Sequence, residues 1–186
     1  MTSLIGVVLA GGKSRRFGSN KALAEFNGKP LIQQSLGLLK SLGFKSCIST
    51  SSVNDYTALG YPLIRDLYPD TGPLGALYSA LVFTKNPILV LTCDMPSITI
   101  ASLQELINKF KERRNSVTLY QRADGQLQPF PGIYALNCLP LIKQSLSINK
   151  LAMRDFLDRI NSKYALDSEH KKAEFKNINY KTDLID

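Results

Sequence analysis

The alternation of short apolar segments with longer amphipathic ones is the feature that most constrains the fold of this chain. Short apolar runs are typical of buried strands, whereas apolar residues spaced three and four apart indicate helices. Because strands separated by helices usually form βαβ units, the pattern predicts an α/β fold with a mostly parallel central sheet. The expected strands cover residues 4–9, 46–51, 62–65, 88–92 and 117–120, and the expected helices cover 30–43, 72–83 and 102–114.

The rest of the chain gives weaker signals. Residues 128–135 contain Pro129 and Pro131, and because proline donates no backbone hydrogen bond, they predict an edge strand or a loop. Helices are expected over 137–146 and 150–160, and the charged tail from Ser168 to Lys176 has no clear pattern. No repeat or linker divides the chain, so we expect a single domain over residues 1–186.

Composition excludes several classes of protein. No apolar run reaches the roughly 18–20 residues of a membrane span, and the N-terminus lacks the features of a signal peptide, so we expect a soluble cytoplasmic protein with no membrane partner. The cysteines Cys47, Cys93 and Cys138 are odd in number and widely spaced, which argues against a disulfide framework and a zinc site. Cys47 and Cys93 fall in strand-like runs and are expected to be buried free thiols.

Positive charge is concentrated near the N-terminus. The net charge is +8, and residues 1–54 hold seven Lys or Arg but a single acid, Glu25. Such an excess indicates an anionic partner, although a solvated basic surface has the same composition. The chain has no zinc finger, RNP motif or regular basic helix, and its basic residues flank glycines in a loop. A small phosphorylated ligand therefore fits better than nucleic acid.

The glycine pair Gly11-Gly12 directly follows the first expected strand. Without Cβ atoms, these residues let backbone N–H groups approach an anion. Arg15, Arg16 and Lys21 follow within the same loop and can balance phosphate charge. The spacing matches neither the P-loop pattern nor the GxGxxG fingerprint. The loop is therefore predicted to bind phosphate without belonging to either of those classes.

Two carboxylates also stand directly after expected strands, where open parallel sheets bind their ligands. Asp94 follows the strand 88–92 closely, and a carboxylate there suits Mg²⁺, which takes one or two carboxylates together with phosphate oxygens. The structural alternative for Asp94 is a helix N-cap near Ser97. Asp66 follows the strand 62–65, and its structural alternative is an Asp-initiated turn.

A glycine-proline motif and the single histidine are two further candidates for a functional role. The sequence Gly72-Pro73-Leu74-Gly75-Ala76 can start a helix and let it pack closely, or its N-terminal amides can help to bind a nucleotide or another substrate. His170 is the single histidine and lies in the charged tail, where a solvated side chain is expected. Its position argues against Ser–His–Asp and Cys–His catalysis.

Residues 9–23, LAGGKSRRFGSNKAL, resemble the LAGGxSxRMGxDKxL signature of the molybdenum cofactor guanylyltransferases, the MobA family of nucleotidyltransferases. Further blocks of the family pattern follow in order along nearly the whole chain. They are GKPL at 28–31, the "I.D…GPL.G" pattern over 64–75, CDMP at 93–96, and NIN with TDL between 177 and 184. The segment from about residue 100 to 172 matches loosely.

The resemblance implies a three-layer α/β/α Rossmann-like nucleotidyltransferase fold. It places nucleotide binding in about residues 1–100 and acceptor binding in about residues 101–186. The implied reaction is transfer of GMP from Mg·GTP to the terminal phosphate of molybdenum-molybdopterin, which forms the guanine dinucleotide cofactor and pyrophosphate. Mg²⁺ is the implied cofactor, and transient contact with molybdoenzymes or their chaperones is the implied protein partnership.

The resemblance also assigns roles to residues. Arg16, Lys21 and Asp94 would be catalytic, with Lys21 on the phosphates and Asp94 holding Mg²⁺. Asp66 would lie near the base or ribose, and Asn177 and Asn179 near the pterin. The residues implied to line the nucleotide are Leu9, Ala10, Gly11, Gly12, Lys21, Ser49, Asp66 and Asp94.

The chain departs from the family pattern at three positions. Phe17 stands where the family has Met, and Asn20 where it has Asp. The family's Asn on the second strand falls within residues 49–51, which are all Ser or Thr here. The resemblance implies that one of these serines replaces part of that contact with the nucleotide; Ser49 is the candidate, and the exact position stays open.

Alternatives remain open at this stage. Gly11 favours guanine, because cytidylyl-transferring relatives have LAAG in place of LAGG. A related nucleotidyltransferase that uses CTP, or a sugar, isoprenoid or cobinamide phosphate acceptor, would share the loop. A non-catalytic adaptor that binds nucleotide or molybdopterin is the alternative outside the enzymes.

Overall fold

The structure of this chain is a computed structural model that describes residues 3–11, 17–18, 20–168 and 171–184. Its large sheet is built from β1 (Ile5–Leu9), β4 (Ser46–Thr50), β5 (Leu63–Arg65), β6 (Ile88–Thr92), β7 (Val117–Gln121), β8 (Leu127–Tyr134) and β9 (Lys163–Asp167). Its α-helices are α1 (Leu31–Ser41), α2 (Gly72–Thr84), α3 (Ile100–Arg113), α4 (Leu139–Ser147) and α5 (Met153–Arg159).

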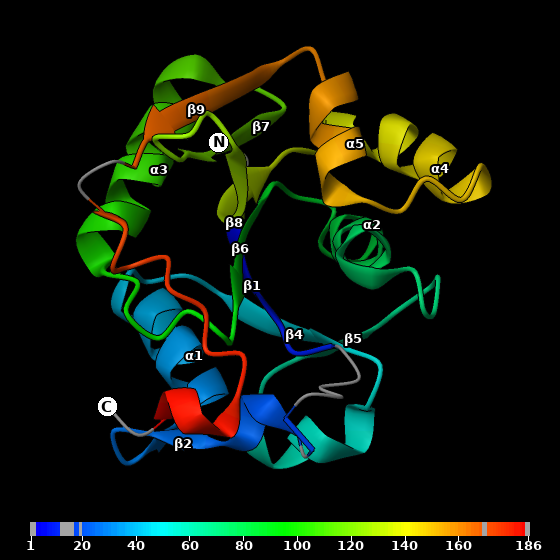
Figure 1. Ribbon diagram of the computed structural model, residues 1–186. Helices are drawn as coiled ribbons and strands as arrows, with labels where there is room; N and C mark the ends of the chain where they lie inside the picture. The colour runs from blue at the N-terminus through cyan, green and yellow to red at the C-terminus, as the bar shows by residue number, and fades with distance from the viewer. Residues whose placement is uncertain (1–2, 12–16, 19, 169–170, 185–186) are drawn as a thin grey trace.

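Helices cover both faces of this sheet. Figure 1 shows α1 and α3 on one side and α2, α4 and α5 on the other. Within the described residues the strand order is β5-β4-β1-β6-β8-β7-β9, and every neighbouring pair is parallel except the two that involve β8. The predicted three-layer α/β/α architecture with a mostly parallel sheet is therefore confirmed.

The centre of the sheet places the carboxyl ends of β1, β4 and β6 at one edge. Leu9, the last residue of β1, lies opposite Ser49 on β4 and Thr92 on β6. β1 and β6 consist almost entirely of apolar residues, whereas β4 mixes apolar residues with Ser and Thr. All three strands are largely buried, as expected for parallel strands covered by helices. The chain order reverses between β1 and β6, and that reversal is where open α/β sheets form their ligand crevice.

The prediction of an edge strand or loop over residues 128–135 is wrong, because β8 lies between β6 and β7. Its pairing with β6 covers only its C-terminal part, from Gly132 onward. Its register with β7 shifts between Gln128 and Gly132. Pro129 and Pro131 fall in that unpaired interval, so their missing N–H groups remove no ladder hydrogen bond.

Several smaller elements were not expected from the sequence. The edge strand β9 pairs in parallel with β7, and β2 (Glu25–Phe26) forms a short hairpin with β3 (Lys29–Pro30) before α1 begins at Leu31. All three cysteines are buried free thiols, as predicted for Cys47 and Cys93. Among the described residues, no helix has the length and apolar character needed to cross a membrane.

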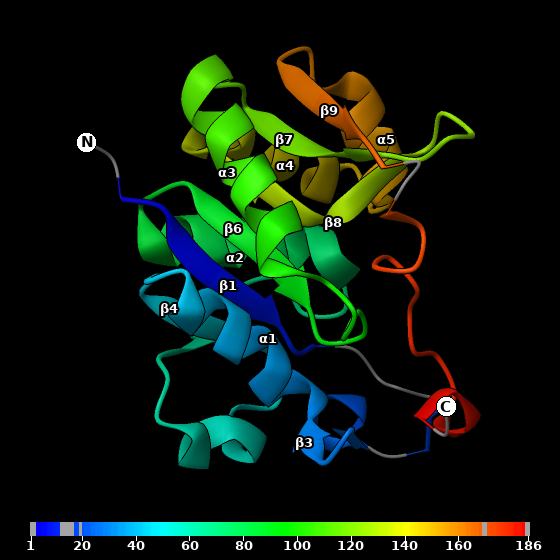
Figure 2. The same ribbon diagram turned by 90° about the vertical axis from the view of Figure 1, so that its left-hand side faces the viewer.

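The charged tail is fixed to the body of the molecule after β9. Glu174 Oε2 accepts hydrogen bonds from the backbone N–H of Thr99 at 3.2 Å and from the Ser102 hydroxyl at 2.6 Å, at the start of α3. Ile178 N–H donates to the Asp94 carbonyl at 2.8 Å. Figure 2 shows this segment, coloured orange to red, running from β9 down one side of the molecule. The tail therefore reaches the end of β6.

Gly75 on α2 has a packing role. A Cβ at Gly75 would overlap the Thr71 side chain and approach the Tyr68 carbonyl oxygen to 2.8 Å. Gly37 on α1 is the opposite case, since it is exposed and a Cβ there would meet nothing within 4 Å. The second glycine of the Gly72–Ala76 motif therefore allows close packing, but against the loop that precedes α2 rather than against the sheet.

We predict opposite effects on stability for these two glycines. Gly75→Ala should lower the free energy of unfolding by about 1–3 kcal/mol, because the neighbouring backbone must move. Gly37→Ala should raise it by about 0.5–1 kcal/mol, because alanine is the better helix former. Urea unfolding of both variants measures these effects, and a destabilised Gly37→Ala or a stabilised Gly75→Ala would contradict the packing described here.

Candidate functional site

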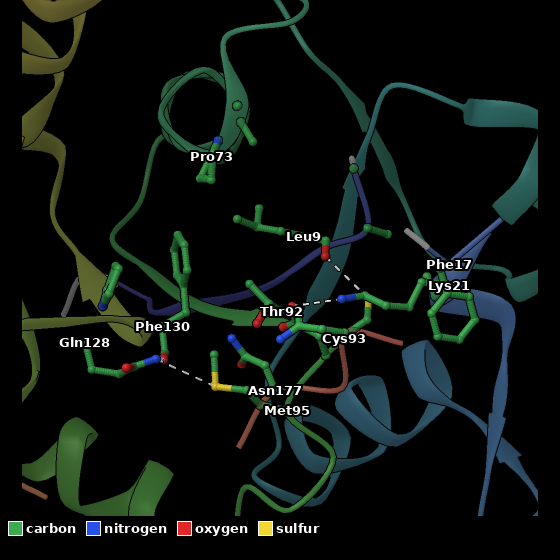
Figure 3. A pocket seen from close by; sticks show the side chains of 18 of the residues that line it. Leu9, Phe17, Lys21, Pro73, Thr92, Cys93, Met95, Gln128, Phe130 and Asn177 are labelled. Atoms are coloured by element: carbon green, nitrogen blue, oxygen red, sulfur yellow. Dashed lines mark hydrogen bonds and ion pairs between the residues drawn. The ribbon is translucent and has the colours of Figure 1, made fainter. Parts of the chain in front are cut away.

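A cavity of about 1070 Å³ opens at the carboxyl ends of β1 and β6. Figure 3 shows Lys21 and Phe17 on one side of it, Gln128 and Phe130 on the other, and Leu9, Thr92 and Asn177 between them. We call the two sides the Lys21 end and the β8 end. The volume lies at the upper end of the roughly 300–1,000 Å³ usual for small-molecule sites. The cavity wall includes Leu9, Ala10, Gly11, Lys21, Asp66, Asp94, Asn177 and Asn179 among the residues predicted from the sequence.

An ion pair joins the first loop to the end of β6. Lys21 Nζ lies 3.0 Å from Asp94 Oδ2 and donates a second hydrogen bond to the Ile178 carbonyl at 2.9 Å. Both charged side chains are largely buried, with 20% and 23% of their surface exposed. An ammonium group has three N–H donors, so one donor of Lys21 remains for a phosphate oxygen.

Asp94 does not cap a helix. The following helix, α3, begins at Ile100, and the Thr99 side chain caps it by accepting from Ser102 N–H. The structural alternative considered for Asp94 is therefore wrong. Asp94 instead lies in the cavity wall, where its carboxylate pairs with Lys21.

Three buried oxygen atoms in the cavity wall lack a hydrogen-bond partner among the described residues. They are Thr92 Oγ1, Asp94 Oδ1 and Asn177 Oδ1. A buried polar group left without a partner costs about 1–3 kcal/mol, which indicates that these atoms serve a ligand, an ion or water.

Asp94 Oδ1 fits Mg²⁺, because it is a hard oxygen donor whose sister oxygen is already fixed by Lys21. No group of three or more His, Cys, Asp or Glu side chains among the described residues could hold a metal by itself. A magnesium ion on Asp94 would thus need phosphate oxygens and water to complete its shell.

Asp66 faces the cavity from the end of β5. The Ser49 hydroxyl donates to Asp66 Oδ1 at 3.4 Å, and Ser49 itself is only 1% exposed and outside the cavity wall. Burial raises the pKa of Asp66 above its ordinary value, and the Ser49 hydrogen bond offsets part of that rise. Ser49 therefore orients the carboxylate, whereas Ser51, just after β4, reaches the wall.

Gly11 leaves open space in the wall. The nearest atom to a Cβ built on Gly11 would be the Ser51 backbone nitrogen at 4.0 Å. Packing against the described residues does not require glycine here. The absence of a side chain instead widens the cavity beside the end of β1.

A polar network that the sequence did not predict supports this end of β1. The buried Tyr56 hydroxyl lies 3.1 Å from the Ala10 carbonyl oxygen and 3.0 Å from Asn20 Oδ1, and burial raises the Tyr56 pKa to about 12, so it stays protonated. Asn20 Nδ2 donates to Asp55 at 3.0 Å. An aspartate at position 20, the usual family residue, would place a second carboxylate against Asp55, so the departure from the family pattern fits its local partner.

The β8 end was also missed. The register shift in β8 brings Phe130, from its unpaired interval, and the neighbouring Gln128 into the wall, beside Arg122 from the turn between β7 and β8. Asn177 and Asn179 reach the same cavity from the tail. A sequence pattern cannot indicate the β8 residues, since their position depends on the bulge.

Some predicted residues lie outside the described part of the chain. These are Gly12, Arg15, Arg16 and His170. The binding and catalytic roles assigned to Gly12 and Arg16 stay predictions, as do those assigned to the residues of the cavity wall.

The profile of the MobA-like NTP transferase domain matches residues 6–164 of the chain. A probable molybdenum cofactor guanylyltransferase from Flavobacterium johnsoniae is 34% identical over 187 residues, which cover all of this chain and 97% of the relative. A protein of the same name from Pyrococcus horikoshii is 32% identical over 97% of each chain.

Solved structures agree in fold. The crystal structure of molybdopterin-guanine dinucleotide biosynthesis protein A from Archaeoglobus fulgidus has a TM-score of 0.82 at 21% identity, over 97% of this chain and 95% of that one. CMP:2-keto-3-deoxy-manno-octonic acid synthetase, in complex with CTP, has a TM-score of 0.73 at 15% identity. With its cavity at the strand ends and its full-length relatives, the chain belongs to the MobA-like NTP transferase family, a family of nucleotidyltransferases, as its sequence predicted.

Proposed function

We propose that this protein transfers GMP from Mg·GTP to the terminal phosphate of molybdenum-molybdopterin and releases pyrophosphate. The observation that carries the proposal is the Lys21–Asp94 pair, whose second carboxylate oxygen has no partner among the described residues, in a cavity of about 1070 Å³ at the strand ends. The names of the full-length relatives support the choice of nucleotide and acceptor.

The reaction needs no protein nucleophile. An oxygen of the acceptor phosphate forms a bond to the α-phosphorus of GTP, and the bond from the α-phosphorus to the bridging oxygen breaks, so pyrophosphate leaves with the electron pair. Catalysis then rests on positioning and on neutralising charge. Lys21 is suited to this, because its ammonium is held by Asp94 and Ile178 and keeps one free donor for the phosphates.

Asp94 is the residue that would hold Mg²⁺. Its Oδ2 is engaged by Lys21, and its Oδ1 is buried without a hydrogen-bond partner among the described residues. When bound there, the ion supplies positive charge to phosphate oxygens. Asp94 would thus hold the ion next to the Lys21 ammonium, which it already binds.

Removal of either charge should abolish most of the turnover. Lys21→Ala and Asp94→Ala are each expected to lower the transfer rate at least about a hundredfold, the scale of one lost electrostatic group. Pyrophosphate release from GTP in the presence of molybdopterin measures this rate. Lys109→Ala, which removes an exposed lysine on α3, is the control and should keep the rate of the unchanged protein. Near-normal turnover in Lys21→Ala or Asp94→Ala would remove that residue from the mechanism.

The choice of guanine can be tested at Gly11. Among the described residues, the nearest atom to a methyl group there is the Ser51 backbone nitrogen at 4.0 Å, so Gly11→Ala should fold normally while it narrows the nucleotide space. We expect GTP affinity to fall about tenfold, as for other steric misfits in binding pockets, and CTP affinity to change less. Calorimetric titration with GTP, CTP, ATP and UTP measures both. Preference of the unchanged protein for CTP would favour the cytidylyl-transferring alternative, and binding without pyrophosphate release would favour an adaptor.

The Asp66 carboxylate is expected to lower the stability of the folded protein and to strengthen GTP binding. Its pKa is raised in the folded state, so the ionised form opposes folding, and this penalty is absent at low pH and complete once the pH exceeds the raised pKa. Asp66→Asn is therefore expected to be more stable than the unchanged protein at pH 7, with the difference vanishing as the pH falls below about 4. The same variant should bind GTP more weakly, since a carboxylate that accepts from the base or ribose is lost. Urea unfolding at several pH values and GTP calorimetry check the two effects, and equal GTP affinity would exclude Asp66 from the nucleotide site.

A further inference from the structure

We propose that Arg122, held in place by the buried amide of Gln128, forms a second anion site at the β8 end of the cavity and binds the phosphate of the acceptor. The inference rests on the proposed function, because it assumes that a phosphate-bearing acceptor occupies this end. It assigns a role to a residue that the sequence motifs do not include.

The backbone of Arg122 is fixed by the turn between β7 and β8. Arg122 N–H donates to the Gln126 carbonyl at 2.8 Å, and Gly125 N–H donates to the Arg122 carbonyl at 2.9 Å. A pair of hydrogen bonds across so short a turn holds the start of the side chain in one place. The direction of the guanidinium then depends on its own contacts.

Gln128 supplies those contacts. Its side chain is 5% exposed, and its Nε2 donates to the Phe130 carbonyl at 2.9 Å, which leaves Oε1 to accept from Arg122 Nε at 3.0 Å. Nε2 also lies 3.9 Å from the sulfur of Met95, the residue after Asp94. The amide therefore links the arginine to the loop that carries the carboxylate of the reaction centre.

The rest of the guanidinium is available. Among the described residues, the two terminal nitrogens of Arg122 have no hydrogen-bond or ion-pair partner in the protein. Their N–H groups form the planar fork that binds two oxygens of a phosphate at once. The hydrogen bond to Gln128 uses only Nε, so it does not account for the terminal N–H groups.

Charge balance gives the reason for a cation at this position. The reaction brings a phosphate acceptor against a triphosphate, and both are negative. The described part of the wall has two basic residues, Lys21 at one end and Arg122 near the other, against the carboxylates Asp66, Asp70 and Asp94. With Lys21 serving the nucleotide, Arg122 is the described cation placed to receive the second anion.

A smaller cavity of about 490 Å³ adjoins the same side chain. It is lined by Arg122, Asp124, Ser168, Lys172 and other residues, so Arg122 lies in the wall of both cavities. The nearby acid, Asp124, already accepts a hydrogen bond from Gln126 N–H at 2.9 Å. The exposed Lys172 adds a further positive charge on this side.

The test is phosphate binding while the nucleotide site is filled. The protein is saturated with the Mg²⁺ complex of α,β-methylene GTP, which cannot release pyrophosphate, and titrated calorimetrically with inorganic phosphate at constant ionic strength. We expect Arg122→Gln to weaken phosphate binding about tenfold to a hundredfold, the range for a lost charged hydrogen-bond donor. The phosphate affinity of Arg122→Lys should lie between those of Arg122→Gln and the unchanged protein, because lysine keeps the positive charge but lacks the planar pair of N–H donors.

Arg154→Gln is the matched control. Arg154 is exposed and paired only loosely with Asp158 on α5, so its variant loses the same charge far from the cavity and should bind phosphate like the unchanged protein. All variants should bind Mg·GTP with unchanged affinity. In steady-state assays, Arg122→Gln should raise the KM for molybdopterin more than it lowers kcat.

The outcomes separate this inference from the proposed function. Equal phosphate affinity of Arg122→Gln and the unchanged protein, or no phosphate binding to the nucleotide-filled protein, would overturn the second anion site. A variant that is less stable but binds phosphate normally would assign Arg122 a structural role only. Failure of the unchanged protein to bind any nucleotide would instead contradict the proposed function, and the phosphate titration of nucleotide-free protein would still compare the variants.

Discussion

The ion pair between Lys21 and Asp94 is the contact on which the site depends. Burying two charges requires that each be compensated, and here the ammonium bonds to both the carboxylate and the Ile178 carbonyl. The residues involved come from the first loop, the end of β6 and the tail, three segments that are far apart in the sequence. Because Ile178 N–H also returns to the Asp94 carbonyl, the tail is bound to the same point through its backbone. The first loop and the C-terminal tail are therefore joined at the Lys21–Asp94 ion pair.

The cavity keeps features that stability alone would remove. Thr92, Asp94 and Asn177 each bury an oxygen without a partner in the described structure, and Asp66 buries a carboxylate whose pKa is raised as a result. Each feature costs free energy in the ligand-free protein. Their concentration around one cavity is the pattern expected of a site shaped for polar ligands at the expense of folding stability.

Much of this arrangement follows from the sequence. The carboxyl ends of parallel strands lie at the same edge of the sheet. The sequence therefore predicts that the glycine after β1 and the carboxylates after β5 and β6 lie close together. The strand period of two does not separate Ser49 from Ser51, because residues two apart face the same layer, so it could not show that Ser51 rather than Ser49 reaches the cavity wall. Two further things could not be predicted. The interior position of β8 depends on a register shift that only tertiary pairing defines, and the contact of Arg122 with Gln128 depends on that shift.

The unpaired interval of β8 affects the shape of the cavity without affecting the pairing of the sheet. Residues between Gln128 and Gly132 take no part in the ladders with β6 and β7, yet they build one wall of the site. Changes of length or side chain there would leave the strand order and the Lys21 end intact. Under the proposed division of the cavity, a fold of this kind can exchange one acceptor for another during evolution while its nucleotide chemistry stays the same, because different stretches of the chain build the two sites.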